Sequence, residues 1–401
     1  MAGIARLIVA LLCCTVAASG CALHRDNPAE VAPIPHPITP PSQEAIKASI
    51  DRGVQFLVGN QNSNGSWGNV RHKAFNIIMP VPSGHHGVRV AVTALSVTAL
   101  IEAGQGQPGV AEALARGEEW LLVNIPLVRQ SSTDVMYNNW AHAYSIVALT
   151  HMLRRDSGDD ARRERIRTVI QHEVDRLVRY QHLDGGWGYY SFRLTSVPSI
   201  AASASFITAT IMIALHDAQE AGFTVPKKTI DRAMASMRID RRPDFGYTYT
   251  NLRGRYPQWD INEPPASMGR TQAGNTAMWL WGEKATTLPI IRAWLNRFFA
   301  RNYWLSMARK QVYPHQGHFG IAAYFFYYAH YYAGLCIDLL PPEERPRFHG
   351  YLANVLVPLQ EKDGSWWDYP LYDYHQQYGT AFAIMSLRRC VESSQPPAAT
   401  Q

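Results

Sequence analysis

Apolar residues recur with a helical period along most of the chain, from about residue 44 to residue 389. The apolar segments form pairs, and the second member of each pair is poor in charge, as Ser203 to Leu215 illustrates. A helix that is apolar on all sides is buried, so the second members are predicted to be inner helices and the charged first members outer helices. No segment alternates apolar and polar residues long enough to predict a strand. The pairs are 44–60 with 88–103, 110–124 with 136–154, 160–181 with 199–221, 226–238 with 270–282, 287–308 with 318–340, and 343–360 with 377–391.

Three turns that follow first members share one pattern: Gln, three residues, Gly, one residue, Trp. They run from Gln61 to Trp67, from Gln181 to Trp187 and from Gln360 to Trp366, each with Leu four residues before the Gln. Gly can adopt the left-handed conformation that stops a helix, and the Gln amide can bond the freed carbonyls. The Trp can lie against a neighbouring helix. The pattern predicts a structural repeat that ties each helical pair to the next, and Phe245-Gly246-Tyr247 is a candidate degenerate copy.

This repeat is the QW motif of squalene and oxidosqualene cyclases, and the chain resembles the terpene cyclase and protein prenyltransferase superfamily. The first copy also matches the longer family pattern, with Arg52-Gly53 ahead of Phe56-Leu57. The resemblance implies an all-α fold, an α/α toroid of about six helical hairpins whose inner helices surround a central cavity. It further implies that the cavity binds an isoprenoid or another apolar ligand.

The N-terminal segment predicts an exported protein. Arg6 precedes the apolar run from Leu7 to Val16, and small residues lead to Cys21. The run is too short to span a membrane, and the small residues before a Cys resemble a bacterial lipobox, which implies cleavage and acylation at Cys21. An ordinary secretory signal is the alternative. The predicted organisation is a lipoprotein signal peptide at 1–20, a Pro-rich tether at 21–43, the toroid at 44–391 and a disordered tail at 392–401. The predicted location is a bacterial cell envelope, anchored to a membrane on its periplasmic or extracytoplasmic face.

Composition supports a packed domain. Of 401 residues, 47 % are hydrophobic and 17 % charged, which argues against disorder. The net charge of +6 is mild and its residues are scattered, so no nucleic-acid partner is predicted. Cys336 and Cys390 both lie on predicted helices, so we expect buried thiols and no disulfide framework.

The topology predicts where a site could lie. Each repeat turn joins the end of an outer helix to the start of an inner helix, so all inner helices begin on one face, among long connecting loops. Helix dipoles there favour an anionic or strongly polar ligand group, and the aromatic run from Tyr324 to Tyr332 favours an apolar body behind it. The catalytic candidates are Asp134, His142, Arg270, Asp373 and His375. The ligand-binding candidates are His85, His86, Asn139, His318, Tyr324, Tyr328, Tyr331 and Tyr378.

The chain departs from the chemistry of its relatives. It lacks the Asp-x-Asp-Asp acid motif of squalene–hopene cyclases, and its closest acids are Asp134, Asp368 and Asp373. The zinc-binding His of prenyltransferases would fall at Tyr378-Gly379-Thr380, where no His is present. We therefore predict no metal and no cofactor, and leave open whether the protein is an enzyme.

Two other functions stay open on the sequence. One is a carbohydrate-active toroid, similar to a polysaccharide lyase, that would use Arg270, His142, Asn139 and Tyr378 in an open cleft. The other is a non-catalytic scaffold for protein partners. A closed aromatic chamber would favour the apolar ligand, an open polar cleft the sugar, and a filled centre the scaffold.

Overall fold

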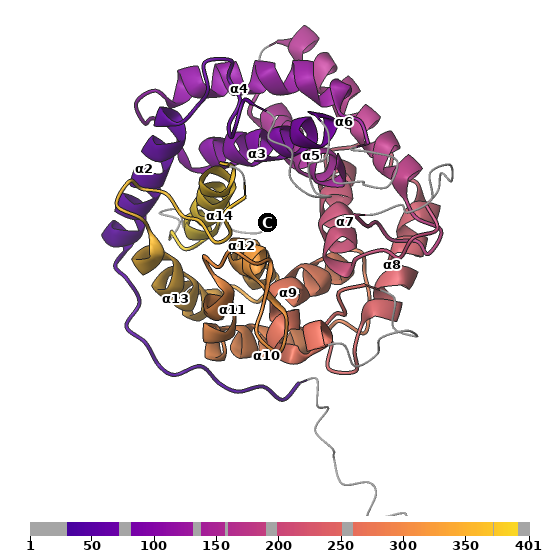
Figure 1. The fold of residues 1–401 in the computed structure, drawn as a ribbon, viewed down its shortest axis with the longest axis vertical. Coiled ribbons are helices and arrows are strands. Elements are labelled where there is room, and N and C mark those ends of the chain that lie inside the picture. The colour runs from indigo at the N-terminus through magenta and orange to yellow at the C-terminus, as the bar shows by residue number, and fades with distance from the viewer. Residues whose placement is uncertain are drawn as a thin grey trace, which may run out of the picture.

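Two concentric rings of helices make up the protein, as a computed structural model shows (Figure 1). The structure describes residues 30–71, 82–130, 138–156, 159–189, 199–250, 260–371 and 373–391. The inner ring consists of α3 (Pro82–Ala103), α5 (Asn138–Arg155), α7 (Ser205–Glu220), α9 (Pro264–Leu280), α12 (Phe326–Asp338) and α14 (His375–Arg389). The outer ring consists of α2 (Gln43–Gly59), α4 (Val110–Asn124), α6 (Asp160–Tyr180), α8 (Lys227–Asp240), α10 (Leu288–Ala300) and α13 (Arg345–Leu356).

The inner ring is closed. Each inner helix packs on the next one, and α14 packs on α3, so the last unit meets the first. The prediction of an all-α toroid is therefore confirmed. Helix α3 is long and apolar enough to cross a membrane by composition alone, but 67 % of its most apolar window is buried in this ring, as for a core helix.

Short elements complete the links. They are η1 (Ile125–Leu127), η3 (Asp260–Asn262), α11 (Tyr303–Ala308), β1 (His315–Gln316), β2 (Ile321–Ala322), η4 (Ala323–Phe325) and η5 (Val357–Leu359). Strands β1 and β2 form a small antiparallel hairpin whose turn contains Gly317 and Gly320 at positive φ. Helix α12 therefore begins later than the predicted residue 318, because the hairpin takes up the preceding residues. Helix α9 begins earlier than the predicted residue 270, at Pro264, because a helix start needs no proline N–H.

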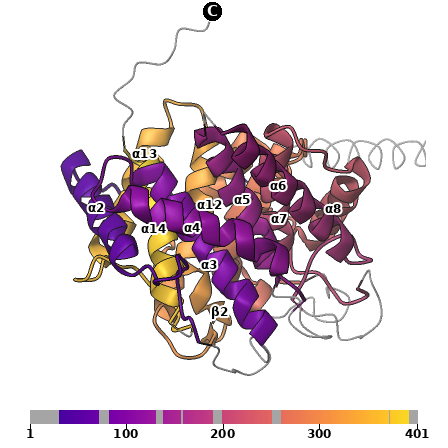
Figure 2. The same cartoon turned by 90° about the horizontal axis from the view of Figure 1, so that it is seen from above.

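The ring has two different faces. We call the face where outer helices end and inner helices begin the loop face, and the face where inner helices end the opposite face. In the side view the start of α3 and strand β2 point to the same side of the molecule (Figure 2). Because outer and inner helices alternate around the closed ring, the inner helices begin on this one face, as predicted.

In each of the three repeat turns, the Gln ties one unit to the next. The side-chain Nε2 of Gln61, Gln181 and Gln360 donates to the Gly of its own turn at 2.7–2.9 Å. The same nitrogen donates at 2.8–2.9 Å to a backbone carbonyl of the following outer helix: Ala113 in α4, Thr229 in α8 and Ser49 in α2. The contact with Ser49 closes the outer ring, because it joins the last turn to the first helix.

The Gly of each turn permits this close approach. Gly65, Gly185 and Gly364 have φ values of 89°, 95° and 91°. A Cβ at any of the three would lie 2.4–2.6 Å from a backbone oxygen of the next outer helix. Only Gly fits both the conformation and the space.

The Trp of each turn ties an outer helix to its own inner helix. Trp67, Trp187 and Trp366 are fully buried, and each indole Nε1 donates at 2.8–2.9 Å to the carbonyl of the Leu ten residues earlier. Each Trp backbone N–H donates at 3.0 Å to a threonine hydroxyl of the next inner helix, which is Thr93, Thr208 or Thr380.

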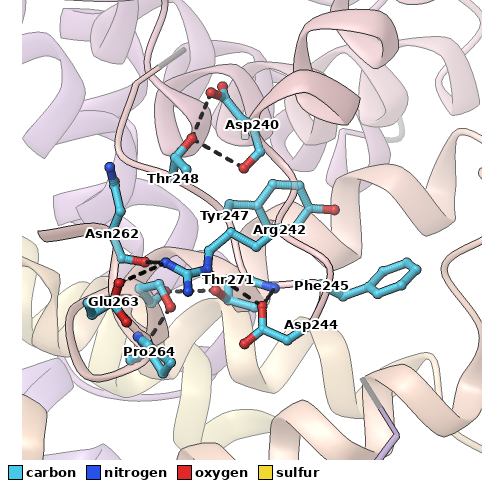
Figure 3. Close-up of polar contacts among 12 residues, drawn as sticks. Asp240, Arg242, Asp244, Phe245, Tyr247, Thr248, Asn262, Glu263, Pro264 and Thr271 are labelled. Atoms are coloured by element: carbon cyan, nitrogen blue, oxygen red, sulfur yellow. Dashed lines mark hydrogen bonds and ion pairs between the residues drawn. The ribbon is translucent and has the colours of Figure 1, made fainter. Parts of the chain in front are cut away.

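The turn after α8 repeats this geometry with other side chains. Phe245 stands at φ 63° where the other turns have Gly, and Tyr247 is buried in the place of the Trp. Figure 3 shows Arg242 of this turn between Asn262, Glu263 and Asp244, while the Thr248 hydroxyl reaches Asp240 at 2.9 Å. The degenerate copy at Phe245-Gly246-Tyr247 therefore folds as a repeat turn.

Residues 30–42 run in an extended path along the outer wall (Figure 1). The Tyr351 hydroxyl donates to the His36 carbonyl at 3.0 Å, and Arg297 Nη2 donates to the Val31 carbonyl at 3.1 Å. The described half of the predicted tether thus lies on the toroid. The signal peptide, Cys21 and the C-terminal tail fall outside the described residues and stay predictions.

Candidate functional site

A cavity of about 420 Å³ lies inside the ring, at the N-terminal ends of the inner helices. Most of its lining side chains are aromatic, and the lining comes from five inner helices, which are α3, α5, α7, α12 and α14, and from the loops above them. The lining residues are Val88, Ala91, Val92, Leu95, Trp140, Tyr144, Tyr189, Phe206, Tyr249, Pro314, His315, Tyr324, Phe325, Tyr328, Tyr369, Leu371, Tyr378 and Phe382. The exposed residues Pro314 and His315 mark the opening on the loop face.

The aromatic wall is a connected cluster of rings. Phe206 meets Phe325 edge to face with centroids 4.8 Å apart, and Trp140 stacks on Tyr144 at 5.7 Å. Phe325 also covers α9, which it touches at Gly269, where a Cβ would lie 2.7 Å from the Phe325 Cβ. Helix α9 therefore contributes no lining residue to the described cavity, and the rings of its neighbours take its place.

The wall opposite the rings is aliphatic. Val88, Ala91, Val92 and Leu95 follow the spacing i, i+3, i+4, i+7 and form one stripe of α3. Small and branched side chains here leave space opposite the rings. The result is a chamber suited to an apolar body.

One carboxyl reaches the cavity wall through a tyrosine. The Tyr378 hydroxyl donates to Asp368 Oδ1 at 2.7 Å, and the backbone N–H groups of Tyr369 and Tyr327 donate to the same carboxyl at 2.7 and 3.1 Å. Asp368 is fully buried, and burial raises its pKa to about 6 in spite of these three donors. Asp368 therefore changes charge close to neutral pH, directly behind a lining hydroxyl.

A second polar group lies at the opening. The hydroxyls of Tyr249 and Tyr324 are 2.8 Å apart, and the Tyr324 hydroxyl lies 3.5 Å from His315 Nε2. Tyr249 follows the turn after α8, and His315 and Tyr324 lie in the segment from β1 to η4. Residues outside the main helices therefore supply the polar groups at the cavity opening.

The lining carries no formal charge at neutral histidine. Among the described residues that form it, none is Asp, Glu, Lys or Arg. An isolated ion transferred into such a chamber would lose its hydration without gaining a partner. The chamber therefore fits neutral apolar molecules with one or two hydrogen-bonding groups.

Sequence comparison places the chain in a family. The model of the squalene-hopene cyclase C-terminal domain matches residues 38–247, just over half of the chain. The chain belongs to the squalene-hopene cyclase C-terminal domain family. This confirms the resemblance that the repeat turns predicted.

Individual relatives are distant. Alpha-2-macroglobulin of Thermotoga maritima is 31 % identical over 75 residues, which cover 19 % of this chain and only 4 % of that protein. The solved type II terpene cyclase MstE of Scytonema, in complex with geranylgeranyl dihydroxybenzoate, is 14 % identical, with a TM-score of 0.48 over 87 % of this chain and 98 % of that one. An inactive variant of the alpha-1,6-mannanase GH76A of Salegentibacter sp. HEL1_6, in complex with alpha-1,6-mannotriose, is 11 % identical, with a TM-score of 0.52 over 86 % of this chain and all of that one. The mannanase likeness supports the toroid fold and carries no activity across.

Three predicted ligand-binding residues line the cavity of this family member: Tyr324, Tyr328 and Tyr378. The Tyr328 hydroxyl donates to the Phe206 carbonyl at 3.0 Å, so its ring is held against the aromatic wall. Tyr331, also predicted, is buried one layer behind, with its ring 5.2 Å from Phe382. Some residues of the aromatic run therefore line the cavity, and others pack behind the lining residues.

His142 and Asn139 point away from the cavity. His142 Nδ1 lies 2.6 Å from Glu173 Oε2 of α6, and both side chains are fully buried. Burial alone would raise the pKa of Glu173, but the charge and hydrogen bond of His142 overcome it, and the net shift is downward. Asn139 donates to the Gly188 carbonyl at 2.9 Å. Both residues hold α5 to neighbouring segments, so their placement does not support the predicted site role.

Arg270 also serves the fold. Its Nε donates to the Tyr247 carbonyl at 2.8 Å, Nη2 to Ile261 at 2.6 Å and Nη1 to Ala266 at 3.1 Å. Burial lowers the pKa of Arg270 to about 10. With its donors committed to backbone carbonyls, the guanidinium clamps the loop between α8 and α9, and it is not placed to bind a ligand head group.

The other predicted residues are spread over the loop face. His85 contacts the Tyr374 hydroxyl, and His86 Nε2 lies 3.0 Å from the Asn124 carbonyl, towards the outer ring. Asp373 is exposed, His375 packs on Trp367, and His318 is exposed 3.8 Å from Asp260. Asp134 lies outside the described residues. The converging polar mouth that the sequence suggested is therefore not formed by these side chains.

Several lining residues went unrecognised in the sequence. Tyr189 stands two residues after Trp187, and Tyr249 stands two residues after Tyr247, so the repeat turns themselves carry rings into the cavity. Asp368, which the sequence already offered as a nearby acid, stands two residues after Trp366 and lies behind the lining. This shared offset was the available signal. Among the described residues, no group of three or more His, Cys, Asp or Glu side chains is arranged to hold a metal ion.

Proposed function

We propose that this protein binds a neutral, largely apolar ligand of the isoprenoid type in its central cavity. The observation that carries the proposal is the lining: eleven aromatic rings face an aliphatic stripe of α3, and no charged side chain joins them. Aromatic faces and methyl groups bind hydrocarbon by removing it from water, at about 25 cal/mol for each Å² buried. Membership of the squalene-hopene cyclase C-terminal domain family supports the same ligand class.

The ligand head group, predicted to be anionic or strongly polar, is a neutral polar group in this proposal. Arg270, the arginine among the predicted site residues, donates to three backbone carbonyls. Asp368 lies behind the wall and would repel an anion when it is ionised. A hydroxyl or carbonyl group, by contrast, could exchange hydrogen bonds with Tyr378 or with the Tyr249–Tyr324 pair.

If the protein also transforms its ligand, Asp368 and Tyr378 are the candidate residues for proton transfer. The Asp-x-Asp-Asp motif is absent from the sequence. Asp368 and Tyr378 are the residues we would examine first, because a carboxyl with a pKa of about 6 lies one hydrogen bond from the cavity. The Tyr378 hydroxyl could orient a ligand group or pass a proton to it.

Mass spectrometry of the purified protein tests the binding proposal. Native spectra and solvent extracts should show a co-purifying neutral lipid. Ala91 faces the rings from α3, so Ala91→Phe should fill part of the cavity and remove the lipid. Ala91→Val, which adds only two methyl groups, should keep it, and both variants should give the far-UV circular dichroism of the parent. An empty parent that also fails to bind added polyprenols and triterpenes would refute the proposal.

A carbohydrate ligand is the competing function. It is supported by the toroid that the chain shares with the alpha-1,6-mannanase, but it needs polar groups in an open cleft. Of the four residues predicted for that role, Arg270, His142 and Asn139 are directed elsewhere, and Tyr378 lines the cavity. Binding of oligosaccharides in preference to polyprenols would decide for this alternative.

We further propose that the chain is exported and held at a membrane through acylated Cys21, as Gly20-Cys21 predicts. Cys21→Ser should stop processing at this site and lipid labelling of the protein. Metabolic labelling with a fatty-acid probe, followed by fractionation of membranes, measures both. A Cys21→Ser protein that is still labelled and processed normally would show that the anchor lies elsewhere.

A further inference from the structure

The inner helices direct charged side chains at the ring axis on the opposite face, beyond the cavity. Glu102 of α3, His151 of α5 and Arg389 of α14 each stand seven residues after a residue that lines the cavity, and Asp217 of α7 stands eleven residues after one. Seven and eleven residues are about two and three whole helical turns, so these side chains share the inward direction of the lining. We call Glu102, His151, Asp217 and Arg389 the axial cluster.

The four side chains of the axial cluster lie close to one another. Glu102 Oε1 lies 3.6 Å from His151 Nε2, and 15 % and 24 % of these side chains are exposed. Arg389 Nη1 forms an ion pair with Asp338 Oδ2 of α12. The same guanidinium is near enough to Glu102 and Asp217 to attract both carboxyls. The Asp217 carboxyl forms no hydrogen bond or ion pair of its own with the described residues.

Carboxyl groups outnumber their counter-charges around the axis. The partly buried guanidinium of Arg389 serves three carboxyls, which are those of Glu102, Asp217 and Asp338. Arg154 and Arg388 also lie nearby, but both are exposed, so water and salt screen their charges. The partly buried end of the ring axis therefore has an excess of negative charge.

The ends of the inner helices add to this negative charge. The last carbonyls of a helix carry partial negative charge, so a carboxylate in the last turn is unfavourable. Glu102, Asp217 and Asp338 nevertheless stand in the last turns of α3, α7 and α12. Burial raises the pKa of Asp217 to about 6 and also raises that of Glu102. These carboxyls thus destabilise the ring unless a cation compensates them.

A buried hydroxyl group is directed at the same place. Tyr331 of α12 is only 7 % exposed, and its ring centroid lies 5.2 Å from that of Phe382. Its hydroxyl is near enough to Arg389, Glu102 and Asp217 for their charges to act on it. It forms no hydrogen bond with another described residue. A polar group so largely removed from water normally has a partner, so this hydroxyl points to a ligand.

We propose that the axial cluster binds a small primary amine, whose ammonium group is held by Glu102, Asp217 and Tyr331. An ammonium group donates three hydrogen bonds, and these three side chains are acceptors. His151 offers a further acceptor nitrogen, because burial lowers its pKa to about 4 and keeps the ring neutral. A metal ion is less suitable, since no group of three described His, Cys, Asp or Glu side chains is arranged to hold one. The site does not require the apolar ligand of the cavity.

Isothermal titration calorimetry of the purified protein with putrescine at neutral pH tests the site. One putrescine should bind per chain. Asp217→Asn and Glu102→Gln should each weaken binding about tenfold or more, because one charge-assisted hydrogen bond is lost. Tyr331→Phe should weaken it about three- to tenfold, because only a hydroxyl is lost. Far-UV circular dichroism and thermal melts should show that the variants are folded.

Glu220→Gln is the matched control. Glu220 stands in the same last turn of α7 as Asp217 but is exposed, so the variant loses the same formal charge and should bind putrescine within about twofold of the parent. Tetramethylammonium, which has no N–H donor, should not compete. The proposal is overturned if putrescine does not bind, if Glu220→Gln weakens binding as much as Asp217→Asn, or if tetramethylammonium or Mg²⁺ binds as tightly as putrescine. Should a carboxyl variant fail to fold, Tyr331→Phe decides, and an unchanged affinity would then refute the site.

Discussion

The turns after α6 and α8 have the same backbone and different side chains. In both, the second residue of the turn donates its N–H to the carbonyl four residues on, from His182 to Gly186 at 2.9 Å and from Arg242 to Gly246 at 2.7 Å. An Asp side chain then accepts the N–H two residues later, at 3.1 Å in the first turn and 3.0 Å in the second. The ring thus imposes the turn, and the repeat residues are one way of stabilising it.

The exchange of side chains shows what each repeat residue does. Where α6 is followed by Gln181, α8 is followed by Arg241, and the Trp294 indole of the next outer helix donates to the Asp244 carbonyl at 2.6 Å. In both turns a side-chain hydrogen bond joins the turn to the next outer helix. In the turn after α6 the donor is the turn's own Gln, and in the turn after α8 the donor is the Trp of the next outer helix. The Gln of the three regular turns is therefore one way to join a turn to the next outer helix. The turn after α8 shows that other side chains can make the same connection.

Removing the buried aromatic ring of a turn should have the greatest effect on stability. Comparing Trp187 with Tyr247 tests whether the turns after α6 and α8 are equivalent. Trp187 is fully buried, and Trp187→Ala should cost about 3–5 kcal/mol of unfolding free energy because a large cavity is left. Trp67→Ala and Trp366→Ala should behave alike, and Tyr247→Ala should cost a similar amount. Urea unfolding monitored by circular dichroism measures all four. A Tyr247→Ala variant as stable as the parent would break the comparison.

Asp368 follows the third regular turn, and its ionisation should make stability fall with pH. Burial raises its pKa from 3.8 to about 6, so the folded protein holds a proton that the unfolded chain has already released between these values. The unfolding free energy should therefore fall as pH rises from about 4 to about 6, by on the order of 3 kcal/mol for a shift of this size. Asp368→Asn should abolish this part of the pH dependence.

The measurement is urea unfolding of parent and Asp368→Asn at several pH values from 4 to 7. Their difference isolates Asp368 from other buried acids, such as Asp217, whose pKa burial also raises to about 6. Parallel pH profiles for the two proteins would mean that Asp368 keeps an ordinary pKa. The Asp368 carboxylate behind Tyr378 would then be charged at neutral pH.

Exchanging the residue at positive φ sharpens the comparison further. Gly185→Ala should cost about 1–3 kcal/mol or more, because the new Cβ would lie 2.4 Å from the Arg232 carbonyl oxygen and the conformation is strained for Ala. Phe245→Gly should leave stability equal or raise it by up to about 1 kcal/mol, since it relieves a left-handed residue. Thermal melts of both variants give the answer. Destabilisation by Phe245→Gly would show that the Phe245 ring, stacked under Arg241, outweighs its backbone strain.

The smallest expected effect is on binding. Tyr378→Phe keeps the ring and removes the hydroxyl that connects Asp368 to the cavity. A ligand held through this hydroxyl should bind about three- to tenfold more weakly, the value of one hydrogen bond. Tyr324→Phe, which removes a hydroxyl at the opening, is the companion variant, and titration with a co-purified or added polyprenol compares them. If neither variant changes the affinity, recognition is entirely apolar.

The helices and the ring could be predicted from the sequence because both follow from periodic burial and a local turn pattern. Most predicted ends lie within a few residues of the observed ones, as α4 at 110–124 shows. The predicted starts of α3, α7 and α9 differ from the observed ones by six residues and that of α12 by eight, and the segment predicted at 287–308 is divided into α10 and α11. At the starts of α9 and α12, Pro and Gly set the backbone and burial is not periodic. The helix order and the ring can thus be predicted from local sequence patterns.

The site was harder to predict because it depends on helix phase. On α5, Trp140 and Tyr144 face the cavity with i, i+4 spacing, so His142 lies about 200° away from Trp140 around the helix and meets Glu173 of α6. Helix phase therefore separates His142 from the lining residues of α5. No phase argument could have placed Arg270, whose partners are carbonyls of an irregular loop.

The bond between Gln360 and Ser49 joins residues that are 311 positions apart in the chain. In an open stack of repeats every contact is between near neighbours, and the terminal repeats can fray independently. Here the first and last units protect each other, so the toroid has no end from which to unravel. The cost is a long loop to be closed during folding, and high contact order slows folding. We expect this ring to fold slowly and to unfold in one cooperative step.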